Sequence, residues 1–430
     1  MSVSRPSRAC IMPLLGRFRT TLLSRRFLPL FVTQALSALL DNLYRNAAVL
    51  LILFSDPRAG ASLVPLAGLL FTLPFVLGSA AAGTIADSHD KAWLIRWNRV
   101  SEFALSLAAA AALIFGGATA LLAVLFGFGV QACFFGPLKY AILPQLLDPS
   151  ELPRGNGWVA AATFIAIVLG TLIGGGLVAL PQGNLWAAAG CVLISATGLC
   201  AALLVPPAPP SGHAPVHWHL LRENRRLLAA VLAEPALRAP ALGISWFWVL
   251  GSVMLAEVPV VAARNLAADA TVATLLLTVV PVGLALGALL AGRFADPGRR
   301  LAFAAAGVSL FLLDFALATS AAPHWANAAR MLADMRGWRL AGDLLAASVC
   351  GGIFVLPLNV ALQARARDRG EQCAERARHR RCRRRGGDAA AAWPVGAGDH
   401  SVAGAGQSGG GVGLVALTGS ERLGISNGRP

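Results

Sequence analysis

The segment GTIADSHDKAWLIR, from Gly83 to Arg96, has a second copy far along the chain, GRFADPGRRLAFA, from Gly292 to Ala304. Both copies begin G-x-x-A-D and continue into basic residues, and each follows the second apolar segment of its half of the chain. One match to so short a pattern carries little information. Two matches at corresponding places indicate an internal repeat, so the sequence predicts two similar halves.

The composition is that of a membrane protein. Hydrophobic residues make up 56% of the 430 residues and charged residues only 13%, whereas a soluble domain has about a quarter charged. Apolar runs recur that are about 20 residues long, the length that crosses a bilayer as a helix. Ten such helices are predicted, at about 27–54, 62–82, 100–115, 118–135, 158–180, 185–205, 241–262, 271–291, 301–319 and 344–362. The predicted fold class is an all-α polytopic membrane helical bundle.

The predicted helices divide into two groups around a Pro-rich linker. Six lie in residues 27–205 and four in residues 241–363, with the linker at 206–240. Residues 1–26 are basic and lack a small-residue cleavage site, so we expect a tail rather than a signal peptide. Residues 364–430 form a basic and then Gly/Ala-rich tail.

The distribution of basic residues predicts the orientation. Placing the N-terminus in the cytoplasm also places there the basic loops at 91–99, 139–154, 222–238 and 293–300. The opposite loops carry few basic residues, except the one after the ninth helix, with Arg330, Arg336 and Arg339. The positive-inside rule therefore favours a cytoplasmic N-terminus.

Two levels of family resemblance follow from these motifs. The duplicated segment between second and third helices resembles the signature loop of the major facilitator superfamily, whose members have two six-helix halves. The first copy departs from the full pattern at Ser88 and Asp90, and the second copy is closer. Five further segments resemble bacterial lysophospholipid transporters, and the transporter half of bifunctional acyl-ACP synthetase/acyltransferase proteins: DNLYRNA, FFGPLKYAILPQLL, GNGWVAAATFIAIVLGTLIGG, SWFW and GGIFVLPLNVALQ. This narrower resemblance covers about Arg26 to Gln363.

The resemblance implies an inner-membrane transporter that flips lysophospholipid, chiefly lysophosphatidylethanolamine, into the cytoplasmic leaflet for re-acylation by alternating access. It also implies an acyltransferase or acyl-ACP synthetase as functional partner. Three alternatives stay open: a proton-coupled drug or metabolite efflux transporter, a non-transporting membrane partner of an acyltransferase, and an inactive truncated copy. The sequence contains no catalytic constellation or cofactor-binding motif, so we expect neither enzyme activity nor a cofactor.

Three charged residues are candidates for substrate binding. Asp41 and Arg45 lie midway along the first predicted helix, four residues apart, so they share a face and can pair. Charges at this depth are costly and should face each other or a cavity. Asp41 would take the ammonium of the headgroup and Arg45 its phosphate, the alternative being a structural ion pair. Lys139, one of only two lysines, would also hold phosphate, unless it is an ordinary cytoplasmic anchor.

Three other acids are candidates for carrying a coupling proton. Glu102 is expected near the start of the third helix, close enough to the interface to be solvated. Glu257 in the seventh helix is deeper, and Asp314 in the ninth is similar.

The signature segments are expected to gate the transport cycle. In the superfamily the Asp of this loop sits against the N-terminus of a helix from the other half, where the helix dipole favours an anion. The residues concerned here are Gly83, Asp87 and Lys91 in the first copy, and Gly292, Asp296, Arg299 and Arg300 in the second. A glycine run at 170–176 has close-packing spacing and is expected at the interface of the halves.

No metal site is expected. The histidines at 213, 217 and 219 lie in the Pro-rich linker without a Cys or carboxylate partner. The scattered cysteines contain no C-x-x-C pair, so they are interpreted as small apolar fillers.

The stretch QARARDRGEQCAERARHRRCRRRGG, from Gln363 to Gly387, breaks the pattern. It holds ten arginines and stands where the second half should continue with two more helices. A tail that binds anionic lipid is one interpretation, and a nucleic-acid-binding arm is another, although we expect no nucleic-acid partner. The preferred hypothesis is a frameshift between about Gln363 and Arg385, because Arg, Ala, Gly, Pro, Cys and His are what GC-rich codons encode when read out of frame. Ten in-frame helices of an expected twelve would then remain.

Overall fold

The computed structural model describes residues 24–55, 57–210, 225, 228–229, 231–291, 297–320 and 323–389. These residues form helices joined by short loops, and no strand occurs among them. Ten of the described helices are long and apolar enough to cross a membrane. The predicted all-α polytopic membrane bundle is therefore confirmed.

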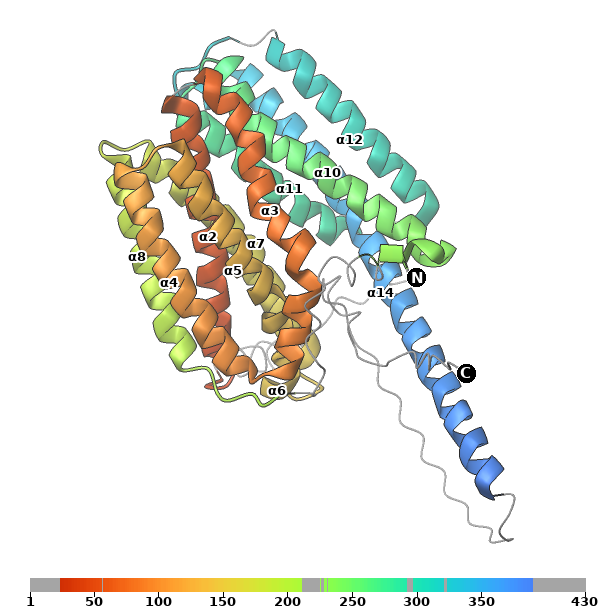
Figure 1. Ribbon diagram of the computed structural model, residues 1–430. Coiled ribbons are helices and arrows are strands. Elements are labelled where there is room, and N and C mark those ends of the chain that lie inside the picture. The colour runs from red at the N-terminus through yellow and green to blue at the C-terminus, as the bar shows by residue number, and fades with distance from the viewer. Residues whose placement is uncertain are drawn as a thin grey trace, which may run out of the picture.

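The helices follow the predicted order (Figure 1). In the first half they are α2 (Leu28–Ser55), α3 (Pro57–Ser88), α4 (Lys91–Phe115), α5 (Ala118–Ala141), the short α6 (Leu143–Leu146), α7 (Leu152–Val178) and α8 (Gly183–Leu203). In the second half they are α10 (Pro235–Arg264), α11 (Ala270–Ala291), α12 (Pro297–Ser320), the short α13 (Ala328–Leu332) and α14 (Met335–Ala389). Two helices differ most from prediction: α4 begins nine residues early, and α14 extends past both expected ends.

The first signature segment is mostly helical rather than a loop, which corrects the sequence interpretation. α3 continues through Ser88 and α4 begins at Lys91, so only His89 and Asp90 lie between them. Asp90 has extended backbone angles and caps α4, because its carboxylate accepts a hydrogen bond of 2.7 Å from the backbone N–H of Trp93. The position where the motif departs from the family pattern is therefore the one that caps α4.

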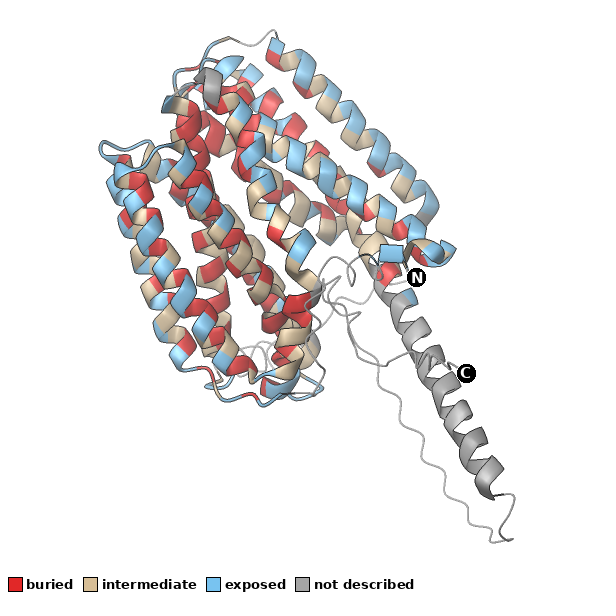
Figure 2. Cartoon of the chain, in the orientation of Figure 1, coloured by how far each residue is buried: buried red, intermediate tan, exposed pale blue. Residues whose placement is uncertain are grey.

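The first half packs around α2. Its buried side chains include Leu40, Leu43 and Tyr44, which join Leu125 and Phe128 of α5 in one apolar cluster. The rings of Tyr44 and Phe128 lie 5.1 Å apart, and the Tyr44 hydroxyl donates to the Leu121 carbonyl. Buried residues concentrate on the facing sides of these helices in Figure 2. α2 is thus fixed at the centre of its half.

The glycine run of α7 makes two kinds of close contact. A Cβ on Gly174 would lie 2.5 Å from the Leu43 carbonyl oxygen, so this glycine lets α7 approach α2 within the same half. Gly175 instead faces Thr274 of α11, in the other half. The prediction of an interface between the halves therefore holds for Gly175, whereas Gly174 packs within the first half.

The second half is less enclosed than the first. α10, α11 and α12 all pack against α14, and α12 lies at the outer edge of the bundle in Figure 1. In the first half α2 packs against α7, and α4 against α8. Among the described residues the second half has no counterpart of α7 or α8. Accordingly, 11% of the residues in the most apolar part of α12 are buried, against 39% of those in the most apolar part of α4.

Candidate functional site

Five charged side chains gather in the first half, on three neighbouring helices. Asp41 and Arg45 come from α2, Arg99 and Glu102 from α4, and Lys139 from α5. Asp41 interacts electrostatically with each of the other four. The structure therefore brings together all three predicted substrate-binding residues, and it adds Arg99, which sequence reasoning did not select. With three cations and two acids, the group has one excess positive charge.

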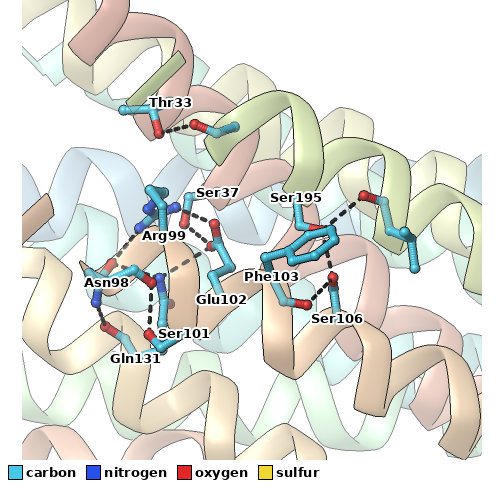
Figure 3. Close-up of polar contacts among 12 residues, drawn as sticks. Thr33, Ser37, Asn98, Arg99, Ser101, Glu102, Phe103, Ser106, Gln131 and Ser195 are labelled. Carbon is cyan, nitrogen blue, oxygen red and sulfur yellow. Dashed lines mark hydrogen bonds and ion pairs between the residues drawn. The ribbon is translucent and has the colours of Figure 1, made fainter. Parts of the chain in front are cut away.

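Arg99 and Glu102 of this group form a buried ion pair (Figure 3). Their side chains are 0% and 1% exposed, and Arg99 Nη1 lies 2.5 Å from Glu102 Oε2. The Ser37 hydroxyl of α2 donates to Glu102 Oε1 at 2.5 Å. A buried ion pair is tolerated only where further hydrogen bonds satisfy its charges, and Ser37 supplies one of them.

The Asn98 amide, itself held by Gln131, and an aromatic ring contact the Arg99 guanidinium from its other sides. Arg99 Nη2 donates to Asn98 Oδ1 at 2.7 Å, and Gln131 of α5 donates to the same oxygen at 2.8 Å. The guanidinium carbon lies 3.9 Å from the centre of the Phe135 ring, a distance typical of a cation–π contact. The network fixes α4 against α5 in the interior of the membrane span.

Asp41 is partly buried, and one of its carboxylate oxygens has no partner. Oδ1 is inaccessible to solvent and makes no hydrogen bond among the described residues. The alternative interpretation, a structural ion pair with Arg45, is not found: within the described chain no N–O distance between Asp41 and Arg45 falls inside ion-pair range. Arg45 donates instead to Asn42 Oδ1 at 2.5 Å, and its guanidinium carbon lies 5.5 Å from the centre of the Phe71 ring. Asp41 thus keeps a buried acceptor that a cationic ligand group would satisfy.

Lys139 lies in the last turn of α5, where it is partly buried. Its ammonium is 5.2 Å from the centre of the Tyr140 ring and interacts electrostatically with Asp41 and Arg99. An ammonium in this position belongs to the same charged group as Asp41.

The three candidate coupling acids lie in different environments. The expected solvation of Glu102 is wrong: α4 begins at Lys91, so Glu102 lies well inside the helix and is buried. Glu257 of α10 is exposed. Asp314 of α12 forms an ion pair with Arg339 of α14. A coupling role for each remains a prediction.

The signature residues are only partly described. In the first copy Gly83 is buried, Asp87 is half-buried and Lys91 is 1% exposed. Burial raises the pKa of the Asp87 carboxyl, an effect that nearby Lys91 opposes.

In the second copy Gly292 and Asp296 lie outside the described residues. Arg299 and Arg300 lie in the first turn of α12, and Arg300 donates to the Ala291 carbonyl at 2.8 Å. The gating role of both copies remains a prediction.

The start of the interdomain linker is tied to the first signature segment. The second carboxylate oxygen of Asp90 accepts from the Ala208 N–H at 3.1 Å, and the Lys91 N–H donates to the Ala208 carbonyl at 2.8 Å. Arg96 donates to the Val205 carbonyl at 2.8 Å. The signature segment therefore anchors the linker besides joining α3 to α4.

The Major Facilitator Superfamily model matches residues 30–372 of this chain. The lysophospholipid transporter LplT of Serratia proteamaculans (strain 568) is 30% identical over 362 residues, covering 81% of this chain and 82% of the relative. The protein of the same name from Escherichia coli O139:H28 (strain E24377A / ETEC) is 30% identical over 363 residues, with the same coverages.

Solved structures with the same fold include a mutant form of the nucleoside transporter NupG, with a TM-score of 0.56 at 13% identity, covering 78% of this chain and 81% of that one. A bacterial homologue of the human lysosomal transporter Spinster, in an inward-facing unoccupied conformation, has a TM-score of 0.52 at 15% identity, covering 77% of this chain and 74% of that one. At such identities these likenesses concern the fold alone. Together with the ten apolar helices, the matches to the family and to its relatives establish that this multi-pass membrane protein belongs to the Major Facilitator Superfamily.

Proposed function

We propose that the chain transports lysophospholipid across the bacterial inner membrane, moving it into the cytoplasmic leaflet. The names of its 30%-identical relatives support this substrate class. The observation that carries the proposal is the group of three cations and two acids on α2, α4 and α5, placed among membrane-spanning helices of the first half. Charges at such depth are costly and mark substrate pathways.

The charged group suits the two charges of a lysophosphatidylethanolamine headgroup. The unpartnered oxygen of Asp41 would accept from the headgroup ammonium, while Lys139 and Arg45 would hold the phosphate. The buried Arg99–Glu102 pair would keep α4 and α5 in place around them. The acyl chain would lie against apolar helix faces, and the halves would rock about the α7–α11 contact at Gly175.

Reconstituted vesicles test this function. Labelled lysophosphatidylethanolamine is added to the outer leaflet, and albumin then extracts whatever has not crossed. We expect protein-dependent protection of the label. Vesicles that protect no lysolipid but export a hydrophilic drug would support the efflux alternative, with Glu257 or Asp41 carrying the coupling proton. A normal rate after combined Asp41→Ala and Lys139→Ala substitution would favour a non-transporting partner of an acyltransferase.

We also propose that residues 364–430 replace two transmembrane helices through a frameshift near codon 363. The support is the asymmetry of the halves: α2 and α4 pack against α7 and α8, whereas α10 and α12 have no such neighbours in the described chain. Translating the other two frames past codon 363 tests this. If neither encodes two apolar spans, the frameshift is excluded. If one does, comparing lysolipid protection by this chain and by the restored chain decides whether this copy is inactive.

We also propose an orientation for the chain and a partner enzyme. The basic loops favour a cytoplasmic N-terminus, which protease protection in inside-out vesicles would test. Lysolipid delivered to the cytoplasmic leaflet needs an enzyme that re-acylates it. We therefore propose an acyltransferase or acyl-ACP synthetase as the functional partner on the cytoplasmic face. Acylated product should therefore accumulate when such an enzyme and acyl donor are placed inside the vesicles.

A further inference from the structure

A second group of charges lies in the other half of the bundle, apart from the site on α2, α4 and α5. It consists of Asp314 on α12 with Arg339 and Asp343 on α14. Arg339 binds Asp314 through two contacts, Nη2 to Oδ1 at 2.5 Å and Nε to Oδ2 at 3.2 Å. This two-pronged geometry fixes the orientation of both side chains.

Asp343 is the buried member of this group. It lies one turn after Arg339 on α14, is 8% exposed, and its carboxyl reaches far enough to interact with Asp314. Its Oδ2 atom is inaccessible to solvent and has no hydrogen-bond partner in the part of the chain that the structure describes. A buried, unpartnered carboxylate oxygen next to a second carboxylate is unfavourable unless a cation or proton joins them.

The charges around Asp343 do not balance. Among the described residues, only Asp314 and Arg339 act on it electrostatically. α11, which packs against the same helix, has no ionisable residue. The ionisable residues that α10 and α13 carry do not act on Asp343; they are Arg238, Glu257, Arg264 and Arg330. Two acids and one arginine leave this three-residue group with one excess negative charge. Uptake of one positive charge would neutralise the group.

We propose that Asp343 and Asp314 form a binding site for one proton, which they share while Arg339 holds Asp314 in place. A proton fits better than a metal cation, because hard cations require six or more oxygen ligands and this group offers two carboxylates. The site is separate from the charged group that would bind the headgroup. Its use as the coupling site of transport rests on the proposed function, but its proton binding does not.

Infrared spectroscopy of the purified full chain in detergent tests the proton directly, without lysolipid. In mildly acidic buffer we expect a protonated carboxyl band in the wild-type protein, and we expect Asp343→Asn to lose one carboxyl equivalent of it. Asp314→Asn should lose it as well, because Arg339 then faces Asp343 alone and favours its ionised form. This second variant also serves if Asp343→Asn fails to fold. The matched control is Glu257→Gln, which removes an exposed carboxyl of α10.

A band of unchanged amplitude in the folded Asp343→Asn or Asp314→Asn protein would overturn the proposal, and so would an equal loss in Glu257→Gln. Vesicle transport is measured separately. If Asp343→Asn loses the band but the wild-type protein moves no lysolipid, the proton site is supported and only the transport function is refuted.

Discussion

Removing the Glu102 carboxylate is expected to destabilise the first half of the bundle strongly. In Glu102→Ala the Arg99 guanidinium, 0% exposed, would lose its counter-ion. It would keep its contacts to Asn98 and Phe135 and its longer-range interaction with Asp41, none of which replaces the direct ion pair. Leaving one partner of a buried ion pair uncompensated costs about 3–5 kcal/mol. For a unit the size of one half, at about 2–4 °C per kcal/mol, the thermal unfolding midpoint should fall by roughly 6–20 °C.

The assay is thermal unfolding of the purified protein in detergent, followed by tryptophan fluorescence. The control is Glu257→Ala, which removes an exposed carboxyl and should change the midpoint little. The double variant Arg99→Met/Glu102→Leu should recover much of the loss, because well-packed apolar residues often replace a buried pair at little cost. The reasoning is refuted if Glu102→Ala unfolds at the same temperature as Glu257→Ala, or if the double variant is less stable than the single one.

Two further predictions concern backbone contacts. Gly174→Ala should weaken helix packing and lower the unfolding midpoint, because the added Cβ meets the Leu43 carbonyl at 2.5 Å; Gly176→Ala is the control, with no atom within 4 Å of its Cβ. Equal midpoints for the two variants would contradict this. Asp90→Ala should cost about 0.5–2 kcal/mol through loss of the cap on α4. It should also speed proteolysis of the linker, whose Ala208 N–H loses its acceptor; an unchanged cleavage rate would count against the anchor.

Helix number and order could be predicted from the sequence because a bilayer imposes a length of apolar residues on each span. The start of α4 could not be predicted the same way. Residues 91–99 contain Lys91, Arg96 and Arg99 and resemble a solvated loop, but Asp90 caps the helix and two of these cations are buried by neighbouring helices. Hydropathy alone cannot anticipate burial that depends on partners from other helices.

The same limitation explains what was missed at the candidate site. Asp41 and Lys139 could be identified from the sequence as candidate binding residues, because charges inside apolar runs are rare. The sequence predicts that α4 begins at about residue 100, nine residues too late. That one error places Arg99 in a loop and its partner Glu102 at the interface. The i to i+4 spacing suggested an Asp41–Arg45 pair, yet Arg45 reaches Asn42 instead. Spacing specifies which residues share a helix face, but it does not specify which rotamers form contacts.

Equilibrium binding of lysophosphatidylethanolamine to the purified chain is the sharpest test of the proposed headgroup site. The proposed ligands Asp41, Arg45 and Lys139 lie on α2 and α5, so we expect binding without residues after 363. We predict saturable binding that falls at least about tenfold, or about 1.4 kcal/mol, in the Asp41→Ala/Lys139→Ala variant. Monoacylglycerol of the same chain length, which lacks both charges, should compete poorly. Equal affinity of wild type and variant, or equal competition by monoacylglycerol, would contradict the account.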